Sequence, residues 1–333
     1  MGKARLVTGA KVVPGAGVAT GADVVTSAQV VTRAEVLAGR QGGLINRDQA
    51  LAEGLTPRQV RTLLDHRRWQ PATRGVYLTP VDSYRDEFDT TRARAAWMGI
   101  LAVPGATATG LAALALHQIP GLPVRIPSEV CLPGGGSIAG PRGVTVRRYQ
   151  SAIPARLLNG FPVAELVPAL AQALCRLDLR HGVAVLDAAL HQGRVTPSEL
   201  EQVRHLIVGQ RGARTARRAL ELADDRAESP LESWARVVFI ESGLAPTTLQ
   251  RAFYDSRGRL WARGDLAWQR ADGTWVLVEM DGFEVHAAPG ALYHDRSRQN
   301  RLMMDHTVTL LRFTGRDLHD GSAVATVRQA LTL

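Results

Sequence analysis

A cluster of acidic residues and one histidine follows an apolar run in the last quarter of the chain. The run Trp275-Val276-Leu277-Val278 leads into Glu279, Asp281, Glu284 and His286. Side chains alternate along a strand, so Glu279 and Asp281 are expected on one face. Carboxylates that share a small patch repel one another, and Mg²⁺ or Mn²⁺ commonly compensates such oxygen ligands. The spacing leaves two alternatives open, a metal site or a solvated turn at the end of a strand.

A second strand, expected at residues 260–269, supplies another carboxylate. The register of the two strands decides whether this carboxylate meets the first cluster. A three-residue loop at residues 271–273, with Gly273 in the left-handed conformation, would place Asp265 opposite Glu279. A two-residue loop would instead mix the apolar and acidic faces.

The apolar residues of the two strands favour the longer loop. With three loop residues, four apolar side chains meet across the strands: Leu266, Trp268, Val276 and Val278. Asp265, Glu279 and Asp281 are then the predicted metal ligands, with the nearby His286 as a further candidate catalytic group. A divalent ion held there could lower the pKa of a bound water and stabilise charge on a phosphate.

Helices and one more strand are expected around this hairpin, in the order helix 229–243, helix 289–306, strand 308–314 and helix 322–331. Ser229-Pro230-Leu231-Glu232 is a capping box, so Glu232 is expected to cap the start of this helix. The second helix carries Arg296, Arg298 and Arg301. These arginines point in different directions, so only some of them can meet a DNA backbone.

The first 43 residues repeat an imperfect hexad. TGAKVV, PGAGVA, TGADVV, TSAQVV and TRAEVL follow one another from Thr8 to Leu37. Hexads can build a β-helix, but five of them are too few for the stacked coils that stabilise a solenoid. Residues 1–43 are therefore expected to be a flexible, low-complexity tail.

Residues 44–83 have the element order of a winged helix. In LTPRQVRTLLDH, Thr56 is a good N-cap and Gln59 completes a capping box, and RRWQPATRGVYL then suggests two short strands around a turn. The helix would enter the major groove and the hairpin would touch phosphates. A small helical cap with solvated arginines is the alternative. The candidate DNA-binding side chains are Arg58, Gln59, Arg61, Arg68 and Arg74.

Residues 84–223 are expected to form a mixed α/β middle domain, and residues 224–333 a separate C-terminal domain. In the middle domain, the Gly-rich stretch PGGGSIAGPRG lacks the ending of a phosphate-binding loop and is interpreted as the loop of a hairpin. A later helix carries Arg211, Arg214, Arg217 and Arg218. These arginines form either a solvated helix face or a surface that follows a nucleic-acid backbone. The predicted fold class is α/β with several domains.

The charge and the residue composition indicate which binding partners are expected. The chain has 333 residues and a formal charge of +9, which comes almost wholly from arginine, since Lys3 and Lys11 are the only lysines. Arginine suits phosphate, but the charge alone favours DNA only weakly. Cys131 and Cys175 have no disulfide or metal spacing, and no apolar run approaches the ~20 residues of a membrane span. A cytoplasmic protein without a membrane partner is expected.

The N-terminal motif is I-x-R-x-Q-A-x-x-x-G-L-T-x-x-Q-V followed by R-G-V-Y, within residues 44–78. It resembles the N-terminal winged helix of AbiEi-family antitoxins from type IV toxin–antitoxin systems. The middle region resembles, with looser motifs, the part that follows in those proteins. The resemblance implies operator DNA or a cognate toxin protein as a partner.

The C-terminal motifs are SPLES, R-G-D-L-A-W, V-L-V-E-M-D-G-F-E-V-H, H-D-R-S-R-Q-N-R-L and T-L-L-R-F-T, within residues 228–333. Their order resembles a bacterial family of the PD-(D/E)XK nuclease superfamily, close to the very-short-patch-repair endonucleases. The resemblance implies a restriction-endonuclease-like αβββαβ core and metal-dependent phosphodiester hydrolysis. Asp265 takes the "PD" position, Glu279 the (D/E) position and Glu232 the helix acid, while His286 follows the E-x-D-G signature.

One departure from that superfamily concerns its lysine, which is expected two residues after Glu279. This chain has Asp281 there, and arginine cannot serve as a general base at neutral pH. His286, Asp281 or a metal-bound hydroxide must take that role, or the site is inactive. The short-patch-repair relatives also use histidine and acidic groups.

Two functions of different classes follow. The first is a metal-dependent DNA endonuclease, guided by a winged helix and acting in phage defence. The second is an antitoxin-like transcriptional regulator with an inactive nuclease fold. Carboxylates repel phosphate unless a metal intervenes, so the acidic cluster favours the endonuclease.

Overall fold

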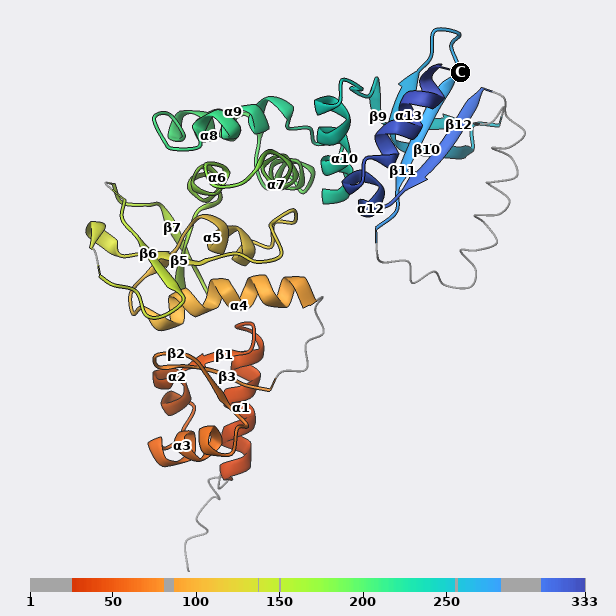
Figure 1. Ribbon diagram of the computed structural model, residues 1–333. Coiled ribbons are helices and arrows are strands. Elements are labelled where there is room, and N and C mark those ends of the chain that lie inside the picture. Colours follow the sequence, from red (N-terminus) through yellow and green to blue (C-terminus); the bar gives the residue numbers. More distant parts are fainter. Residues whose placement is uncertain are drawn as a thin grey trace, which may run out of the picture.

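The computed structural model describes residues 26–80, 87–136, 138–149, 151–254, 257–282 and 307–332. Over these residues, helices combine with three separate sheets, so the expected mixed α/β class is confirmed. In Figure 1 the N-terminal unit is red to orange, the middle unit runs from orange at its first helix through yellow to green, and the C-terminal unit runs from teal at its first helix to dark blue. No helix within the described ranges is long and apolar enough to cross a bilayer.

The N-terminal unit combines three helices with a small antiparallel sheet in which β3 lies between β1 and β2. Its elements are α1 (Ser27–Gly39), β1 (Leu44–Asn46), α2 (Arg47–Ala52), α3 (Pro57–Asp65), β2 (Gln70–Thr73) and β3 (Val76–Leu78). The expected capping box of Thr56 and Gln59 begins α3, and the hairpin of β2 and β3 forms as expected. Trp69 and Ile45 are fully buried at the centre of the unit.

Helix α1 corrects the expectation that all of residues 1–43 form a flexible tail. The Thr26 side chain accepts the amide of Gln29, and the Gln29 side chain accepts the amide of Thr26 at 2.7 Å, which is a capping box. Val30, Ala34 and Ala38 repeat every four residues and are buried in the N-terminal core. The last hexads thus conceal an amphipathic helix, whereas residues 1–25 lie outside the described residues.

The middle unit is built on a five-stranded sheet with the order β6-β5-β4-β8-β7. Its elements are α4 (Glu87–Ala102), β4 (Thr107–Ala108), α5 (Gly110–Leu116), β5 (Ser128–Cys131), the 3₁₀ turn η1 (Pro133–Gly135), β6 (Val144–Arg147), β7 (Ala155–Leu158), β8 (Phe161–Ala164), α6 (Leu166–Leu174), α7 (Leu179–His191), α8 (Pro197–Leu206) and α9 (Ala213–Leu222). Leu44 and Val76 of the N-terminal sheet join its apolar core. The two units therefore pack directly against each other through apolar side chains.

The pairing of β5 and β6 corrects a second expectation. The two strands are parallel, with Ser128 opposite Val144 and Cys131 opposite Arg147. A hairpin requires antiparallel strands, so the Gly-rich segment between them is a crossover connection and not a hairpin loop.

The C-terminal unit is a four-stranded sheet with the order β12-β11-β10-β9, in which only β11 and β12 are parallel. Its elements are α10 (Pro230–Glu241), β9 (Thr248–Tyr254), β10 (Leu260–Gln269), β11 (Trp275–Met280), β12 (Val308–Phe313), α12 (Gly315–His319) and α13 (Ser322–Thr332). Phe239 of α10 and Val327 of α13 share a core with Leu266 and Val278 of the sheet. The helix expected over residues 289–306 lies outside the described residues.

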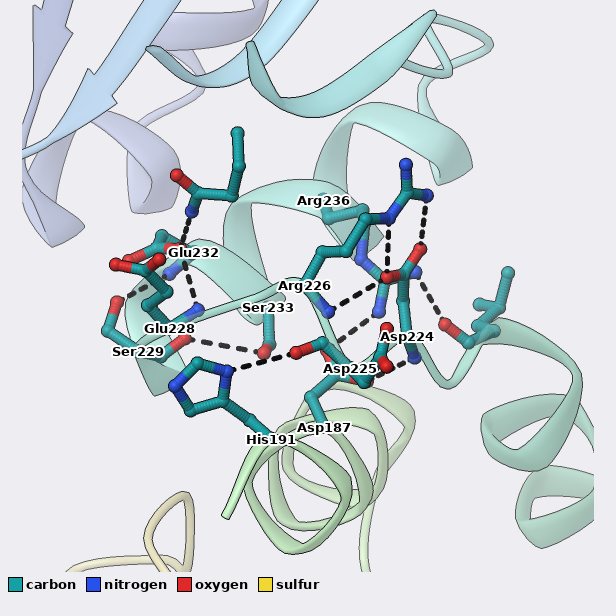
Figure 2. A network of polar contacts seen from close by, with 12 residues as sticks. Asp187, His191, Asp224, Asp225, Arg226, Glu228, Ser229, Glu232, Ser233 and Arg236 are labelled. Carbon is teal, nitrogen blue, oxygen red and sulfur yellow. Dashed lines mark hydrogen bonds and ion pairs between the residues drawn. The ribbon is translucent and has the colours of Figure 1, made fainter. Parts of the chain in front are cut away.

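Helix α10 joins the middle and C-terminal units. Val237 packs into the middle core, while Phe239 packs into the C-terminal core. Arg236 and Asp187 of α7 form an ion pair at 2.7 Å, with side chains only 7% and 1% exposed. Figure 2 shows this pair within a wider polar network around the segment that leads into α10. The boundary expected near residue 224 therefore coincides with buried polar contacts.

Candidate active site

The hairpin of β10 and β11 has the register that its apolar pattern predicts. The expected cross-strand pairs form: Leu266 with Val278 and Trp268 with Val276. Gly273 has φ +88°, and the bond from the Arg270 amide to the Thr274 carbonyl closes a three-residue loop at 271–273. The predicted loop is confirmed. The paired residues end at Leu266 and Val278, one position before the predicted pair of Asp265 and Glu279.

Asp265 lies where the alternation of β10 is interrupted. Ala262 and Ala267 are buried in one small cluster with Leu277, and a Cβ on Gly264 would meet the Leu277 Cβ at 2.9 Å. Positions 262, 264 and 267 thus face the same side, which a regular strand does not permit. The strict alternation expected for this strand is therefore wrong at Asp265.

The Asp265 carboxylate is turned toward β11. It accepts a hydrogen bond from the backbone amide of Met280 at 2.8 Å, directly after Glu279 in the chain. Burial raises the pKa of Asp265, and the charges of Glu228 and Asp281 act in the same direction, while the Met280 amide and Arg263 oppose the rise. Asp265 is thus a half-buried carboxylate among other acids.

Glu279 is mostly buried and is ion-paired. Its side chain is 14% exposed, and its Oε2 accepts a hydrogen bond from Arg312 Nε at 3.0 Å. Arg312 is the neighbour of Glu279 on the parallel strand β12. The guanidinium therefore supplies a positive charge in a site without lysine. The motif T-L-L-R-F-T contains this arginine, but no local sequence signal pairs it with Glu279.

Asp281 is exposed immediately after the end of β11. Its amide donates to the Phe313 carbonyl at 2.8 Å, which extends the pairing of β11 and β12. Its charge acts on the Asp265 carboxyl, so the two acids lie near each other. The structure thus brings Asp265, Glu279 and Asp281 to one end of the hairpin.

Glu232 lies on the first turn of α10, near Asp265. Ser229 Oγ accepts the Glu232 amide at 3.2 Å, as expected of a cap, but the Glu232 carboxylate accepts the Glu228 amide at 2.9 Å instead of the Ser229 amide. Only half of the predicted capping box is therefore present. Burial raises the pKa of Glu232, the Glu228 amide opposes this, and the charge of Asp265 adds to the rise.

Gln250 is a site residue that the sequence does not reveal. Its Nε2 donates to Glu232 Oε2 at 2.7 Å, whereas its buried Oε1 has no hydrogen-bond partner among the described residues. It lies on β9 between Leu249 and Arg251, which pair with Leu266 and Gly264, so it is level with Asp265. A φ of +53° turns its backbone, a feature that no residue pattern announces.

Several predicted site residues cannot be placed. His286, Arg296, Arg298 and Arg301 lie outside the described residues.

The donors of the site suit a hard divalent cation, although their present contacts compete with one. Asp265, Glu279 and the unpartnered Oε1 of Gln250 offer oxygen ligands of the type that Mg²⁺ and Mn²⁺ prefer. Among the described residues, no three His, Cys, Asp or Glu side chains already stand as a metal-binding group. The Met280 amide engages only Oδ2 of Asp265, which leaves lone pairs of that carboxylate for a cation, whereas the Arg312 guanidinium competes with a cation for Glu279.

The N-terminal unit presents part of the predicted DNA-binding set. Arg58 and Arg61 on α3, and Arg74 in the turn after β2, are exposed and form no side-chain hydrogen bond or ion pair within the described residues. Val60 points inward, and Leu63 and Leu64 are partly buried against the same core, as expected.

Arg68 and Gln59 have structural contacts instead. Arg68 binds Glu35 of α1 through two hydrogen bonds of 2.8 and 2.7 Å, and Trp69 donates to the same carboxylate. Gln59 completes the cap of α3 and donates to Ser27 at 2.6 Å. Both side chains hold α1 against the rest of the unit, so each has a structural role beside the DNA contact expected of it.

Comparison with known proteins gives partial similarity. No family model matches the chain. Two proteins of Mycobacterium tuberculosis, uncharacterized protein MT2308 of strain CDC 1551 / Oshkosh and uncharacterized protein Rv2248 of strain ATCC 25618 / H37Rv, are each 38% identical over 120 residues. The match covers 36% of this chain and 43% of each relative. The chain thus spans less than half the length of the curated relatives it matches.

Proposed function

We propose that the protein is a metal-dependent DNA endonuclease whose N-terminal unit delivers it to DNA. The nearness of Glu232 on α10 to Asp265 on β10 carries this proposal, because the charge of Asp265 acts on the Glu232 carboxyl. Glu279 precedes Met280, whose amide donates to Asp265. Burial, together with the charges of nearby acids, raises the pKa of Glu232 and of Asp265, which costs folding free energy and is typical of functional sites. Gln250 adds a buried oxygen without a partner at the same level of the sheet.

The chain's own residues would divide the work in this site. Asp265 and Glu279 would hold Mg²⁺ or Mn²⁺, and Gln250 would hold Glu232 in place through the 2.7 Å hydrogen bond. The bound ion would activate a water and stabilise charge on the scissile phosphate. Arg312, released from Glu279, would lie beside that phosphate. Asp281 or His286 would accept the proton of the water, since arginine cannot.

The order of elements supports the finer fold that this activity requires. Helix α10, the antiparallel strands β9, β10 and β11, and the parallel strand β12 match five elements of the αβββαβ order of a restriction-endonuclease-like core. Residues 283–306, where the second helix of that order is expected, lie outside the described residues. The polar end of the hairpin is where the acids of such a core gather. The likeness to very-short-patch-repair endonucleases is part of the proposal.

The N-terminal unit has the order α1-β1-α2-α3-β2-β3 and the sheet order β1-β3-β2. We take this unit as a winged helix, in which α3 enters the major groove and the β2–β3 turn meets the backbone. The unpaired Arg58, Arg61 and Arg74 support that orientation.

A plasmid cleavage assay with added metal tests the proposal. The full-length protein should nick or cut DNA with Mg²⁺ or Mn²⁺ and not with excess chelator. Asp265→Ala and Glu279→Ala should each lose cleavage while binding DNA normally. Arg58→Ala/Arg61→Ala should weaken DNA binding and leave the metal requirement unchanged. Absence of cleavage with every DNA form and both metals would refute the enzyme.

A second candidate function is a DNA-binding regulator related to AbiEi antitoxins. It is favoured by Asp281 at the place of the lysine and by the neutralisation of Glu279 by Arg312. A regulator should bind its own promoter in a salt-sensitive manner. Promoter binding should survive Asp265→Ala and weaken in Arg58→Ala/Arg61→Ala, and it should persist under chelation. Unchanged binding after both arginine substitutions would exclude this version.

A further inference from the structure

A cavity of about 740 Å³ lies between α1 of the N-terminal unit and α4, α5 and β7 of the middle unit. We propose that this cavity binds a small phosphorylated ligand through Arg40, Arg156 and Arg194. It is distinct from the acidic site, since none of its lining residues comes from the C-terminal unit. Its volume falls within the usual range of small-molecule sites, roughly 300–1,000 Å³.

Two of the arginines are fixed by one histidine. Arg156 Nη2 donates to His117 Nδ1 at 2.9 Å, and Arg194 Nη1 donates to the His117 carbonyl at 3.3 Å. Because arginine only donates, His117 Nδ1 must accept, and Nε2 then donates to the Ala164 carbonyl at 2.7 Å. The imidazole is therefore neutral. The neutral His117 ring orients the Arg156 guanidinium but does not neutralise its positive charge.

The positive charge of the cavity is not balanced from within. Arg40, Arg156 and Arg194 form no ion pair in the described part of the chain. The cavity's one acidic lining residue, Glu35, is already engaged by Arg68 and Trp69. Guanidinium groups bind phosphate oxygens through paired donors, so a phosphate group is the anion that this cluster suits best.

The remaining wall suits an apolar body beside the phosphate. Trp97, Leu116 and Leu158 contribute apolar surface, and Thr32 and Thr90 contribute hydroxyl-bearing side chains. Such a mixture of apolar lining with a few convergent polar groups is typical of small-molecule sites. The ligand class is therefore a phosphorylated molecule with an apolar or aromatic portion, of about nucleotide size.

The backbone conformation of Gln118 also indicates a functional position at this cavity. It follows α5 with φ +60°, at a position that ends helices and usually carries glycine. A side chain at this conformation is disfavoured, and such strain is concentrated at functional sites. Gln118 lines the cavity, so its side chain is placed where a ligand could use it.

The test is calorimetric titration of the full-length protein with inorganic pyrophosphate and, separately, with ATP. Wild type should bind at least one probe, and Arg156→Ala/Arg194→Ala should weaken that binding about tenfold or more, as expected for lost charge-assisted contacts. Arg211→Ala/Arg214→Ala removes the same charge from exposed positions immediately before α9 and in its first turn, and this variant should bind as wild type does. Arg40→Ala, whose side chain has no bond to lose in the described residues, should weaken binding several-fold without unfolding the protein.

Three results would overturn the proposal. One is that neither probe binds wild type at millimolar concentration, and another is that both double variants lose binding equally. The third comes from a parallel titration with a short duplex DNA. It is that wild type binds the DNA, that Arg156→Ala/Arg194→Ala weakens this binding, and that neither small probe binds. The cluster would then be a contact for the DNA backbone and not a ligand site.

Discussion

Gln250 combines an unfavourable backbone with contacts to the acidic site. A left-handed residue other than glycine costs roughly 1 kcal/mol or more, and Gln250 adopts φ +53° inside β9. Its side chain holds Glu232 and leaves Oε1 buried without a partner in the described residues. In the proposed site, the hydrogen bond of the Gln250 side chain to Glu232 is the interaction that offsets this backbone strain.

Two substitutions separate the strain from the function. Gln250→Gly and Gln250→Ala both remove the contact with Glu232, but glycine tolerates the left-handed backbone. We expect the glycine variant to be more stable than the alanine variant by about 1 kcal/mol in urea unfolding. Both variants should cleave DNA more slowly than Gln269→Ala, a control at an exposed position of the same sheet. Equal stability of the two variants would contradict the strain.

His117 predicts how stability depends on pH. Burial lowers the pKa of His117, the Ala164 carbonyl opposes this, and the charges of Arg156 and Arg194 lower the pKa further. The unfolded histidine, with a pKa of about 6.5, therefore takes up a proton more readily than the folded one. Stability is fully present above that pH and decreases as the pH falls below it, by at most about 1.4 kcal/mol per pH unit.

Urea unfolding at pH 7.5 and pH 5.5 measures this dependence. His117→Gln should flatten the loss of stability on acidification, while His66→Gln, at an exposed position, should retain it. An identical loss in wild type and His117→Gln would show that other groups cause the effect.

At the scale of elements, the sequence predicts structure that depends on neighbouring residues but does not predict which distant strands pair. The hairpin loop and register follow from apolar residues on both strands and from Gly273, all within a few residues of one another. Helix α1 was hidden by the composition of the hexads, although the spacing of Val30, Ala34 and Ala38 is helical. The parallel partners of β5 and β11 are set by the sheet and not by nearby residues.

The irregularity at Asp265 also belongs to this scale, and Gly264 makes it possible. A Cβ there would stand 2.9 Å from the Leu277 Cβ, closer than two such atoms approach. Gly264→Ala should therefore cost about 1–3 kcal/mol in unfolding free energy, as overpacking does. Gly282→Ala is the control, because no atom of the described residues lies within 4 Å of its added Cβ. Unfolding midpoints that do not differ would mean that β10 relaxes without cost.

At the scale of the whole molecule, Asp187 and Arg236 hold α10 between two cores. Asp187 also accepts the Asp224 amide at 2.8 Å, and Arg226 binds Asp224 at the surface of the same network (Figure 2). The C-terminal unit, with its candidate site, is thus fixed to the middle unit by buried polar contacts. The proposed delivery of this site to DNA depends on that attachment.

Removing one partner of the buried pair should be severe. Arg236→Ala leaves Asp187 buried without its cation, and we expect a loss of about 3–5 kcal/mol in unfolding free energy. Arg226→Ala breaks a half-exposed pair and should cost at most about 1 kcal/mol. Thermal unfolding of both variants measures the contrast. A similar small loss in both would show that the network does not join the units.

The central claim is that Asp265 and Glu279 form a metal-dependent hydrolytic site. The most direct measurement is the single-turnover rate of DNA cleavage as Mn²⁺ is titrated, for wild type and for the nearly isosteric Asp265→Asn. The rate of wild type should rise with Mn²⁺ and saturate, and that of Asp265→Asn should fall by a factor of 100 or more, which is about 2.7 kcal/mol of transition-state stabilisation. Equal rates for the two proteins, or cleavage that persists without metal, would contradict the claim.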